Sequence, residues 1–213
     1  MALAARNANT MWVLHFLSHL KDGGTAGFVM ATGELASSET TRLEVRRTLV
    51  EQDYVDCIIG LTGQLFANTQ IPCSLWFLSK NRKGGGGFRK RTSEVLFIDG
   101  RKLGTFIPGS RRQKQLSLQE IDRIASTYQQ FRRRSNPEEV PGFCKVAKLD
   151  EIRFRRYSLA PGRYAGSALI DDEEGPFEEK YPRLLALLRS QFSEAARLSA
   201  AITTQLSEIS NDV

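Results

Sequence analysis

The run Val55-Asp-Cys-Ile-Ile-Gly-Leu61 decides the fold, because a short, mostly apolar run of this kind is typical of a buried β-strand. Similar runs stand before and after it, Thr25-Ala-Gly-Phe-Val-Met-Ala31 and Cys73-Ser-Leu-Trp-Phe-Leu78. Residues 9–20 and 39–53 have the apolar spacing of amphipathic helices. Helices that alternate with buried strands predict an α/β fold.

The first helix is expected to bury an apolar face on which Trp12, Phe16, His19 and Leu20 recur at intervals of three and four residues, alongside Val13 and Leu17. His15 is expected on the same apolar face. Because both histidines are assigned to this face and no Gly-x-Ser-x-Gly motif occurs, a hydrolase triad is not predicted.

The pattern continues beyond the three strands. Glu94-Val-Leu-Phe-Ile98 predicts a further strand, residues 143–152 a short strand and turn, and residues 157–166 a loop. A third helix is expected over 116–134. Ser117 and Glu120 have the spacing of a capping box, and the apolar face comprises Ile121, Ile124, Tyr128 and Phe131.

Charge is distributed unevenly along the chain. The net charge is +6, but the segment from Ser167 onward contains nine acidic and four basic residues. The rest therefore carries 26 basic and 15 acidic residues. A basic body with an acidic end predicts a polyanionic partner for one part and a different partner for the other. The alternative is a basic surface that only aids solubility.

The most basic stretch runs from residue 80 to residue 92 around four glycines and contains no acidic residue. It is expected to join two strands as a flexible loop. No helix follows the glycines, so a phosphate-binding loop of the nucleotide-binding kind is not predicted. Its cations are candidates for contacts with the DNA backbone, the alternative being a merely solvated loop: Lys80, Arg82, Lys83, Arg89, Lys90 and Arg91.

Composition excludes several other classes. No apolar run is long enough for a membrane-spanning helix, and the N-terminus lacks the length of a signal peptide. Three cysteines without Cys-x-x-Cys spacing, and only two histidines, argue against a structural metal site. Cys57 and Cys73 stand in apolar runs and are expected to be small buried side chains in a cytoplasmic protein.

The segment from Glu178 onward predicts a long helix with an apolar seam. Leu185, Phe192, Ser199 and Leu206 recur every seven residues, as do Leu188, Ala195, Ile202 and Ile209. An exposed seam that pairs with another chain is favoured over a helix packed on its own domain. The candidate interface residues are Leu185, Leu188, Phe192, Ile202, Leu206 and Ile209.

Several separated motifs, in order, resemble the modification (M) subunit of type I restriction–modification systems. They are Asn7-Ala-Asn-Thr-Met-Trp12, His15-Phe16, Gly24-Thr-Ala-Gly-Phe-Val29, Ile58-Ile-Gly-Leu-Thr-Gly-Gln-Leu-Phe66, Thr69-Gln-Ile-Pro72, Leu75-Trp-Phe-Leu78, Glu94-Val-Leu-Phe-Ile-Asp99 and Pro161-Gly-Arg-Tyr164. The resemblance spans nearly the whole chain but only the C-terminal part of the family's chain. It implies the later strands of a Rossmann-like methyltransferase sheet, whose open edge would need a partner.

The resemblance implies an adenine-N6 DNA methyltransferase that uses S-adenosylmethionine. The family's glycine-rich cofactor motif and its Asn-Pro-Pro-aromatic catalytic motif are absent from this sequence. The chain is therefore expected to bind no cofactor and to be inactive alone, as a truncated, split or excised part of the enzyme. It has no catalytic residue of its own. Its contribution would be an aromatic face for the flipped adenine, and the candidate is Phe66. The alternative is that Phe66 fills the core.

Three regions are expected: residues 1–82, the later half of the methyltransferase domain; residues 83–166, a basic loop, strand and helix; and residues 167–213, an acidic linker and partner-binding helix. The resemblance implies DNA, a specificity subunit, a restriction subunit and the missing N-terminal half as partners. A non-catalytic DNA-binding or assembly module of the same system is the alternative function.

Overall fold

The computed structural model describes residues 8–166 and 177–211. The chain divides into two compact units, Met1–Leu169 and Ile170–Val213. The division expected at residue 82 falls inside the first unit, between two strands of the same sheet. None of the described helices combines the length and apolar composition needed to cross a membrane.

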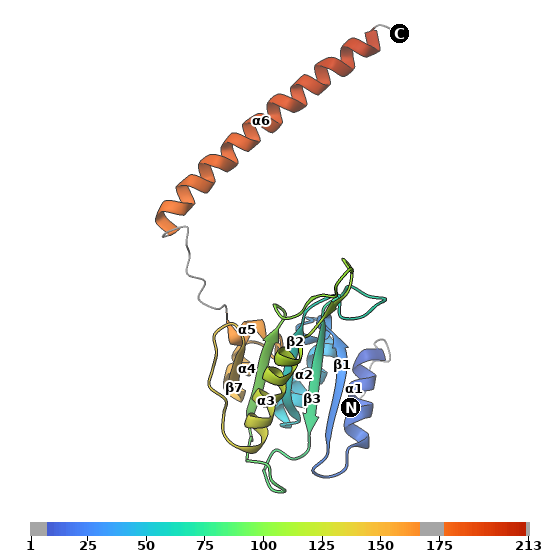
Figure 1. Cartoon of the computed structure of the whole chain (residues 1–213), viewed down its shortest axis with the longest axis vertical. Helices are drawn as coiled ribbons and strands as arrows, with labels where there is room; N and C mark the ends of the chain where they lie inside the picture. The colour runs from blue at the N-terminus through green and yellow to red at the C-terminus, as the bar shows by residue number, and fades with distance from the viewer. Residues whose placement is uncertain (1–7, 167–176, 212–213) are drawn as a thin grey trace. The chain divides into compact units, whose positions relative to one another are not determined.

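The first unit is built on a mixed five-stranded sheet with the order β1-β3-β2-β4-β7 (Figure 1). β2 and β4 run parallel, and the other neighbouring pairs are antiparallel. The strands lie where the apolar runs of the sequence predicted them. Their order in the sheet differs from their order in the sequence, because β2 lies between β3 and β4. The five strands are β1 (Thr25–Ala31), β2 (Val55–Leu61), β3 (Cys73–Ser79), β4 (Glu94–Gly100) and β7 (Cys144–Lys148).

β1 lies at one edge of this sheet and pairs only with β3 among the described strands. Gly27, Val29 and Ala31 are exposed along it, and Val29 remains 50% exposed. An apolar edge strand of this kind presents unpaired backbone groups that another chain segment can satisfy. β1 and β7 are the two edge strands of this sheet in the described chain, and an exposed edge at β1 is consistent with the open edge expected from the sequence.

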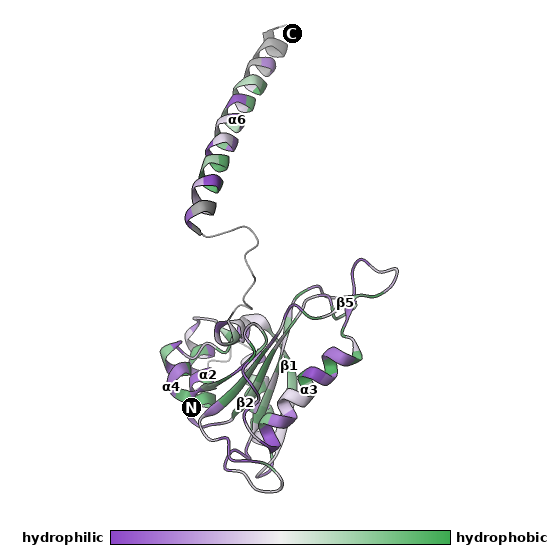
Figure 2. Ribbon diagram, turned by 60° about the vertical axis from the view of Figure 1, so that its left-hand side comes forward, coloured by the Kyte–Doolittle hydropathy of each residue, from purple (hydrophilic) through white to green (hydrophobic). Residues whose placement is uncertain are grey.

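Helices cover both faces of the sheet (Figure 2). α3 (Leu118–Arg133) lies on one face, and α1 (Ala8–His19), α2 (Thr40–Glu51), α4 (Leu149–Phe154) and α5 (Gly162–Ala165) contribute to the other. A short 3₁₀-helix, Thr32–Leu35, follows β1. The predicted capping box of α3 is present, since Ser117 Oγ accepts from Glu120 N and Glu120 Oε2 accepts from Ser117 N.

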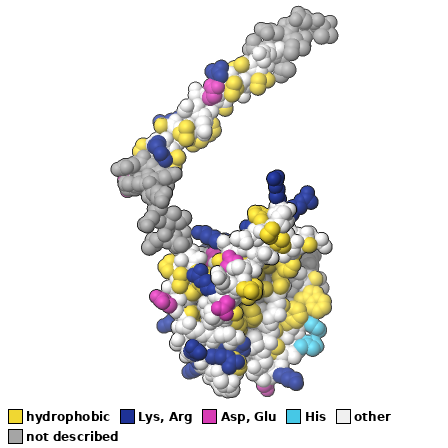
Figure 3. Space-filling view, in the orientation of Figure 1, with side chains coloured by type: hydrophobic (Ala, Val, Ile, Leu, Met, Phe, Trp, Pro, Cys, Tyr) yellow, Lys and Arg dark blue, Asp and Glu magenta, His cyan; other side chains and the backbone are white. Residues whose placement is uncertain are grey.

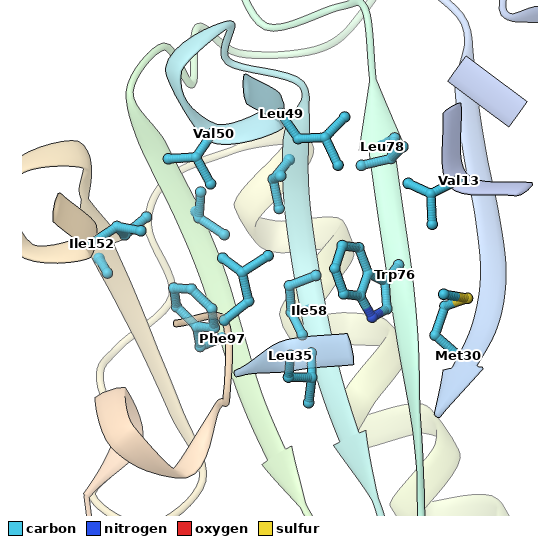
Figure 4. Close-up of a cluster of buried hydrophobic side chains, with 14 of the residues drawn as sticks. Val13, Met30, Leu35, Leu49, Val50, Ile58, Trp76, Leu78, Phe97 and Ile152 are labelled. Carbon is cyan, nitrogen blue, oxygen red and sulfur yellow. The ribbon is translucent and has the colours of Figure 1, made fainter. Parts of the chain in front are cut away.

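Two apolar clusters, one on each face, stabilise the unit. One joins Val13, Leu49, Ile58, Trp76 and Phe97 (Figure 4). The other packs Ile124, Tyr128 and Phe131 of α3 onto β2 and β4. All three cysteines, including Cys144, are buried and free, as expected for Cys57 and Cys73. Because a buried leucine or phenylalanine contributes about 1.5–3 kcal/mol, these clusters are the main source of stability.

The predicted inner face of α1 is correct for Val13, Leu17 and Leu20, which lie in or against a core cluster, and wrong for Trp12 and His19. Val13 is the buried apolar residue of the helix, whereas Trp12 is 56% exposed and both histidines are exposed. Trp12 instead packs edge-on against His15 and beside Phe16 along the outer surface. Spacings of three and four residues fit several faces of a helix, and only packing against β1 and β3 selects one.

Two further elements differ from the expectation, and a third lies where no element was expected. The turn after β7 is helix α4, the loop at 157–166 contains α5, and residues 101–115 form a small hairpin of β5 (Thr105–Phe106) and β6 (Lys114–Gln115). On α3, Ile124, Tyr128 and Phe131 are buried as predicted, but Ile121 is 47% exposed. Helices α4 and α5 and strands β5 and β6 contain too few residues for a periodic apolar pattern to develop.

In the second unit the described residues form helix α6 (Phe177–Asn211), with Pro182 near its start. Its 35 residues correspond to about 50 Å of helix at 1.5 Å per residue. Pro182 is the sixth residue of the helix and has no amide hydrogen, so the i to i−4 hydrogen bond to the carbonyl of residue 178 is missing there.

Candidate functional site

The carboxyl ends of β1, β2 and β4 meet at one edge of the sheet, the upper end of the body in Figure 1. Ligands of open α/β sheets bind preferentially outside this edge. Three segments lie there: the 3₁₀-helix after β1, the loop of residues 62–72 after β2, and the hairpin of residues 101–115 after β4.

The loop of residues 62–72 presents Phe66, which is 46% exposed and belongs to neither core cluster. A one-residue bridge joins Phe66 to Thr69, whose amide donates to Phe66 O at 3.4 Å. The loop closes at Gly63, where an added Cβ would stand 2.4 Å from Gln70 O, so only glycine fits. Phe66 is thus on a folded loop and not in the core, and Ile71 beside it is 64% exposed.

A hollow of about 490 Å³ opens at the same edge. Its floor includes Gly60 and Pro161, and two guanidinium groups belong to its lining, those of Arg101 and Arg163. Arg101 makes a two-pronged ion pair with Asp99, with Nε–Oδ1 at 2.8 Å and Nη2–Oδ2 at 2.6 Å. This pairing raises the pKa of Arg101. The charge of Arg101 is thus balanced by Asp99, and Arg163 is the second guanidinium group of the lining.

The hairpin of residues 101–115 is tied to its surroundings at both ends. Gly104 N donates to Glu120 Oε1 of α3 at 2.9 Å, and Lys114 N donates to Gln64 O at 2.8 Å. At the tip, Ser110 Oγ accepts from the amides of Arg112 and Gln113. The hairpin is thus fixed directly beside the loop that carries Phe66.

The glycine-rich loop predicted to contact DNA lies at the opposite end of the sheet. It leaves the end of antiparallel β3 and enters the start of β4, which puts it at the amino ends of β2 and β4 (Figure 1). A seven-residue strand spans about 23 Å, so this loop is remote from Phe66. The predictions for Phe66 and for the basic loop therefore concern two separate surfaces.

Two of the loop's cations are interior residues. Arg82 is 4% exposed and Arg91 is fully buried, and both pair with the buried carboxylate of Asp56. Tyr128 of α3 donates to the second oxygen of Asp56 at 2.9 Å. Burial lowers the pKa of Arg82 to about 10 and also lowers that of Arg91.

These guanidinium groups also donate to backbone carbonyls of the loop. Arg82 Nη2 donates to Arg91 O at 2.9 Å, and Arg91 Nη2 to Asn81 O at 2.7 Å. Buried charges that are fully paired in this way hold a loop in shape and leave no face for a phosphate. For Arg82 and Arg91 the predicted DNA contact is therefore wrong.

The other four cations of the loop differ in exposure. Arg89 is half-buried and donates from Nε to Phe131 O at 2.6 Å, and Lys80 Nζ donates to Leu20 O at 2.6 Å. Only Lys83 and Lys90 are exposed. Aromatic contacts add to the packing, with the Arg132 guanidinium 4.4 Å from the centre of the Phe88 ring. The loop is thus a braced structural element with two free lysines.

Sequence reasoning missed the cations at the carboxyl edge. Between Arg101 and Gln119 stand five basic residues and no acidic one, a signal as clear as that of the glycine-rich loop. Lys102, Arg111 and Arg112 are exposed there, and Figure 3 shows Lys and Arg side chains projecting from the loops at this end of the body. What the sequence could not show is that this segment lies beside Phe66.

The seam of α6 is exposed where its side chains are described. Leu188, Phe192 and Ile202 are 45%, 67% and 57% exposed, and Leu185 is intermediate. The side chains of Leu206 and Ile209 lie outside the described residues. Within the described parts of the chain, no group of three His, Cys, Asp or Glu side chains is arranged to hold a metal ion.

The model of the N-6 DNA methylase family matches residues 2–173. The chain belongs to this family. It is 38% identical to the type I restriction enzyme HindI methylase subunit of Haemophilus influenzae, over 94% of this chain and 43% of that protein. It is 37% identical to the MjaIX methylase subunit of Methanocaldococcus jannaschii, over 90% of this chain and 33% of that protein.

Solved structures agree with this assignment. The methyltransferase subunit of a type I restriction-modification system from Streptococcus thermophilus superposes with a TM-score of 0.64 at 28% identity, covering 76% of this chain and 30% of that one. The chain thus spans less than half the length of the relatives it matches. Its fold is the mixed α/β fold of type I methyltransferase subunits.

Proposed function

We propose that this chain is part of a type I restriction–modification adenine-N6 DNA methyltransferase and supplies one wall of the target-base site. Family membership and identity to type I methylase subunits support the reaction class. The observation that carries the proposal is Phe66, an exposed aromatic side chain on a folded loop at the carboxyl edge. A flipped adenine needs such a face to stack on.

The hollow at the carboxyl edge does not fit the cofactor that the family uses. S-adenosylmethionine carries a positively charged sulfonium and a ribose. A carboxylate usually accepts the hydrogen bonds of the ribose hydroxyl groups. The hollow at the carboxyl edge instead presents Arg101 and Arg163, and Asp99 is already held by Arg101. The methyl donor and the group that activates the adenine amine would come from the rest of the enzyme, so the chain alone is inactive.

The open edge of β1 is the proposed junction with that missing part. Val29 and Trp12 are exposed there, and an apolar groove on the α3 side of the sheet runs over Leu75 and Phe77. A strand paired to β1 would cover unpaired backbone groups and apolar surface together. The specificity subunit is the proposed partner of α6, since a seam of exposed leucine, phenylalanine and isoleucine side chains suits helix pairing.

The test is methylation by the complete assembly, with the chain, its missing half and the specificity subunit produced together. Replacing a stacked aromatic residue costs about 1–3 kcal/mol, so Phe66→Ala should lower kcat/KM roughly 5- to 150-fold, while Phe66→Tyr retains activity. Ile71→Ala on the same loop is the matched control. Equal losses in Phe66→Ala and Ile71→Ala would contradict the proposal.

The alternative is a non-catalytic DNA-binding or assembly module of the same system. The paired and basic lining of the hollow at the carboxyl edge favours it, and it predicts that assemblies containing the chain bind DNA without methylating it. Titration of the chain alone with S-adenosylmethionine should give no binding heat under either proposal, and a stoichiometric micromolar site would contradict both.

A further inference from the structure

Lys102, Arg111 and Arg112 of the hairpin are exposed, and none forms an ion pair or side-chain hydrogen bond within the described chain. In the braced loop the buried arginines have carboxylate and carbonyl partners. Because these exposed side chains have no ion-pair partner in the described chain, they are available to bind an anion from outside it. Their number, three on a segment without acidic residues, favours a polyanion over a single small ligand.

The position of the hairpin beside the Phe66 loop indicates which polyanion it would bind, namely the DNA that presents its target base to Phe66. Its strand β6 is bonded to the base of the Phe66 loop through Lys114 N and Gln64 O, at 2.8 Å. Lys114 Nζ also reaches Thr62 Oγ1 at 3.5 Å and lies 5.3 Å from the centre of the Phe106 ring. A nucleotide whose base stacks on Phe66 brings its flanking phosphates to the same edge, since successive phosphates of a strand follow every few ångströms.

We propose that the hairpin of residues 101–115 binds the DNA backbone next to the target base, with Lys102, Arg111 and Arg112 as its phosphate contacts. This inference rests on the proposed function, in which Phe66 faces the target adenine. These contacts would contribute to DNA affinity and to the placement of the DNA, but not to sequence specificity. The arginines lie on a short surface turn, whereas base recognition needs a rigidly oriented two-pronged donor.

The chain contains its own control. Lys83 and Lys90 are also exposed and unpaired by side-chain bonds in the described chain, but lie at the other end of the sheet. Arg111→Gln/Arg112→Gln and Lys83→Gln/Lys90→Gln remove the same charge from surface positions that the core does not use. Any difference between the two variants therefore reports location and not net charge.

The experiment measures fluorescence anisotropy of a labelled duplex with the full chain at 50 to 200 mM KCl. Each phosphate contact contributes about 0.9 to the slope of log affinity against log salt. The hairpin variant should lower the slope by about 1.8, so that wild type loses roughly tenfold more affinity across this range than the variant does. Arg111→Lys/Arg112→Lys should restore the slope, because phosphate contact needs charge and not the guanidinium fork.

The outcomes separate the two proposals. If wild type binds and the hairpin variant keeps its slope, or if both glutamine variants lose it equally, the hairpin assignment is wrong while the Phe66 test still stands. Failure of the lysine variant to restore binding would indicate base reading and would also overturn the assignment. If wild type shows no salt-dependent DNA binding, the proposed contribution of this chain to the DNA site fails as well.

Discussion

The two basic segments of this chain share a basic composition without acidic residues but have different structural surroundings. The glycine-rich loop of residues 80–92 has six cations, two of which are buried against Asp56, and the hairpin of residues 101–115 has five. In the hairpin only Arg101 is held by a carboxylate in the described chain, and Lys102, Arg111 and Arg112 face solvent. The number of basic residues does not distinguish a loop held by buried ion pairs from a binding surface. The distinction depends on where the acidic partners lie.

The difference comes from one carboxylate in β2. Asp56 is fully buried beneath the start of the glycine-rich loop and is satisfied by Arg82, Arg91 and Tyr128. A charge buried at that position requires partners, so it draws the loop's arginines inward. At the carboxyl edge the buried carboxylate of Asp99 pairs with Arg101, whereas Ser110 organises the hairpin tip with neutral hydrogen bonds.

The largest expected effect is on the free energy of unfolding, and it tests the buried ion pairs of Asp56 with Arg82 and Arg91. Asp56→Ala leaves Arg82 and Arg91 buried without a counter-charge, which should lower the free energy of unfolding by about 3–5 kcal/mol in urea denaturation. If that variant does not fold, Asp56→Asn, which keeps an acceptor oxygen, should fold with a smaller loss. Lys90→Gln, one residue from Arg91, is the control and should change stability by no more than about 0.5 kcal/mol. A stable Asp56→Ala would mean that the arginines are not held by this carboxylate.

A second variant separates DNA contact from assembly. Leu188→Asp/Ile202→Asp places two carboxylates on the exposed seam of α6, where each apolar side chain would contribute about 1.5–3 kcal/mol when buried by a partner. Association with the specificity subunit should be lost in pull-down, while circular dichroism of the α/β unit and the hairpin's salt slope stay unchanged. Surviving association, or an unfolded α/β unit, would assign the seam to the chain's own core.

The smallest effect concerns how the hairpin is held. Hydrogen bonds from Gly104 N and Ser117 lower the pKa of Glu120 below its ordinary value of 4.5. Because the folded-state pKa is the lower one, this stabilisation is present above pH 4.5 and is lost as the pH falls through the folded-state pKa. Glu120→Gln should therefore be less stable than wild type at pH 7, with a gap that closes in acid. A gap independent of pH would contradict the ionised pairing.

Much of the framework was predictable because its signals are local. Buried strands appear as apolar runs, and the Ser117–Glu120 spacing predicted the start of α3, since a capping box is built from residues three apart. The burial of Cys57 and Cys73 followed from the same apolar runs. The candidate site was predicted only for Phe66, whose neighbours in sequence are also its neighbours in the loop. On α1 the inward packing of Val13, Leu17 and Leu20 was predicted, but the exposure of Trp12 was not, because it depends on the strands that the helix covers.

The sequence by itself determined the α/β class, the family and the presence of two segments rich in cations, because each of these is recorded in composition or in short ordered motifs. Only the tertiary structure decided what each segment does. The glycine-rich loop turns inward because Asp56, far from its arginines along the chain, is buried beneath it. The hairpin keeps its charges exposed beside Phe66 because parallel β2 and β4 end at the same edge, a pairing between distant residues that no local pattern records.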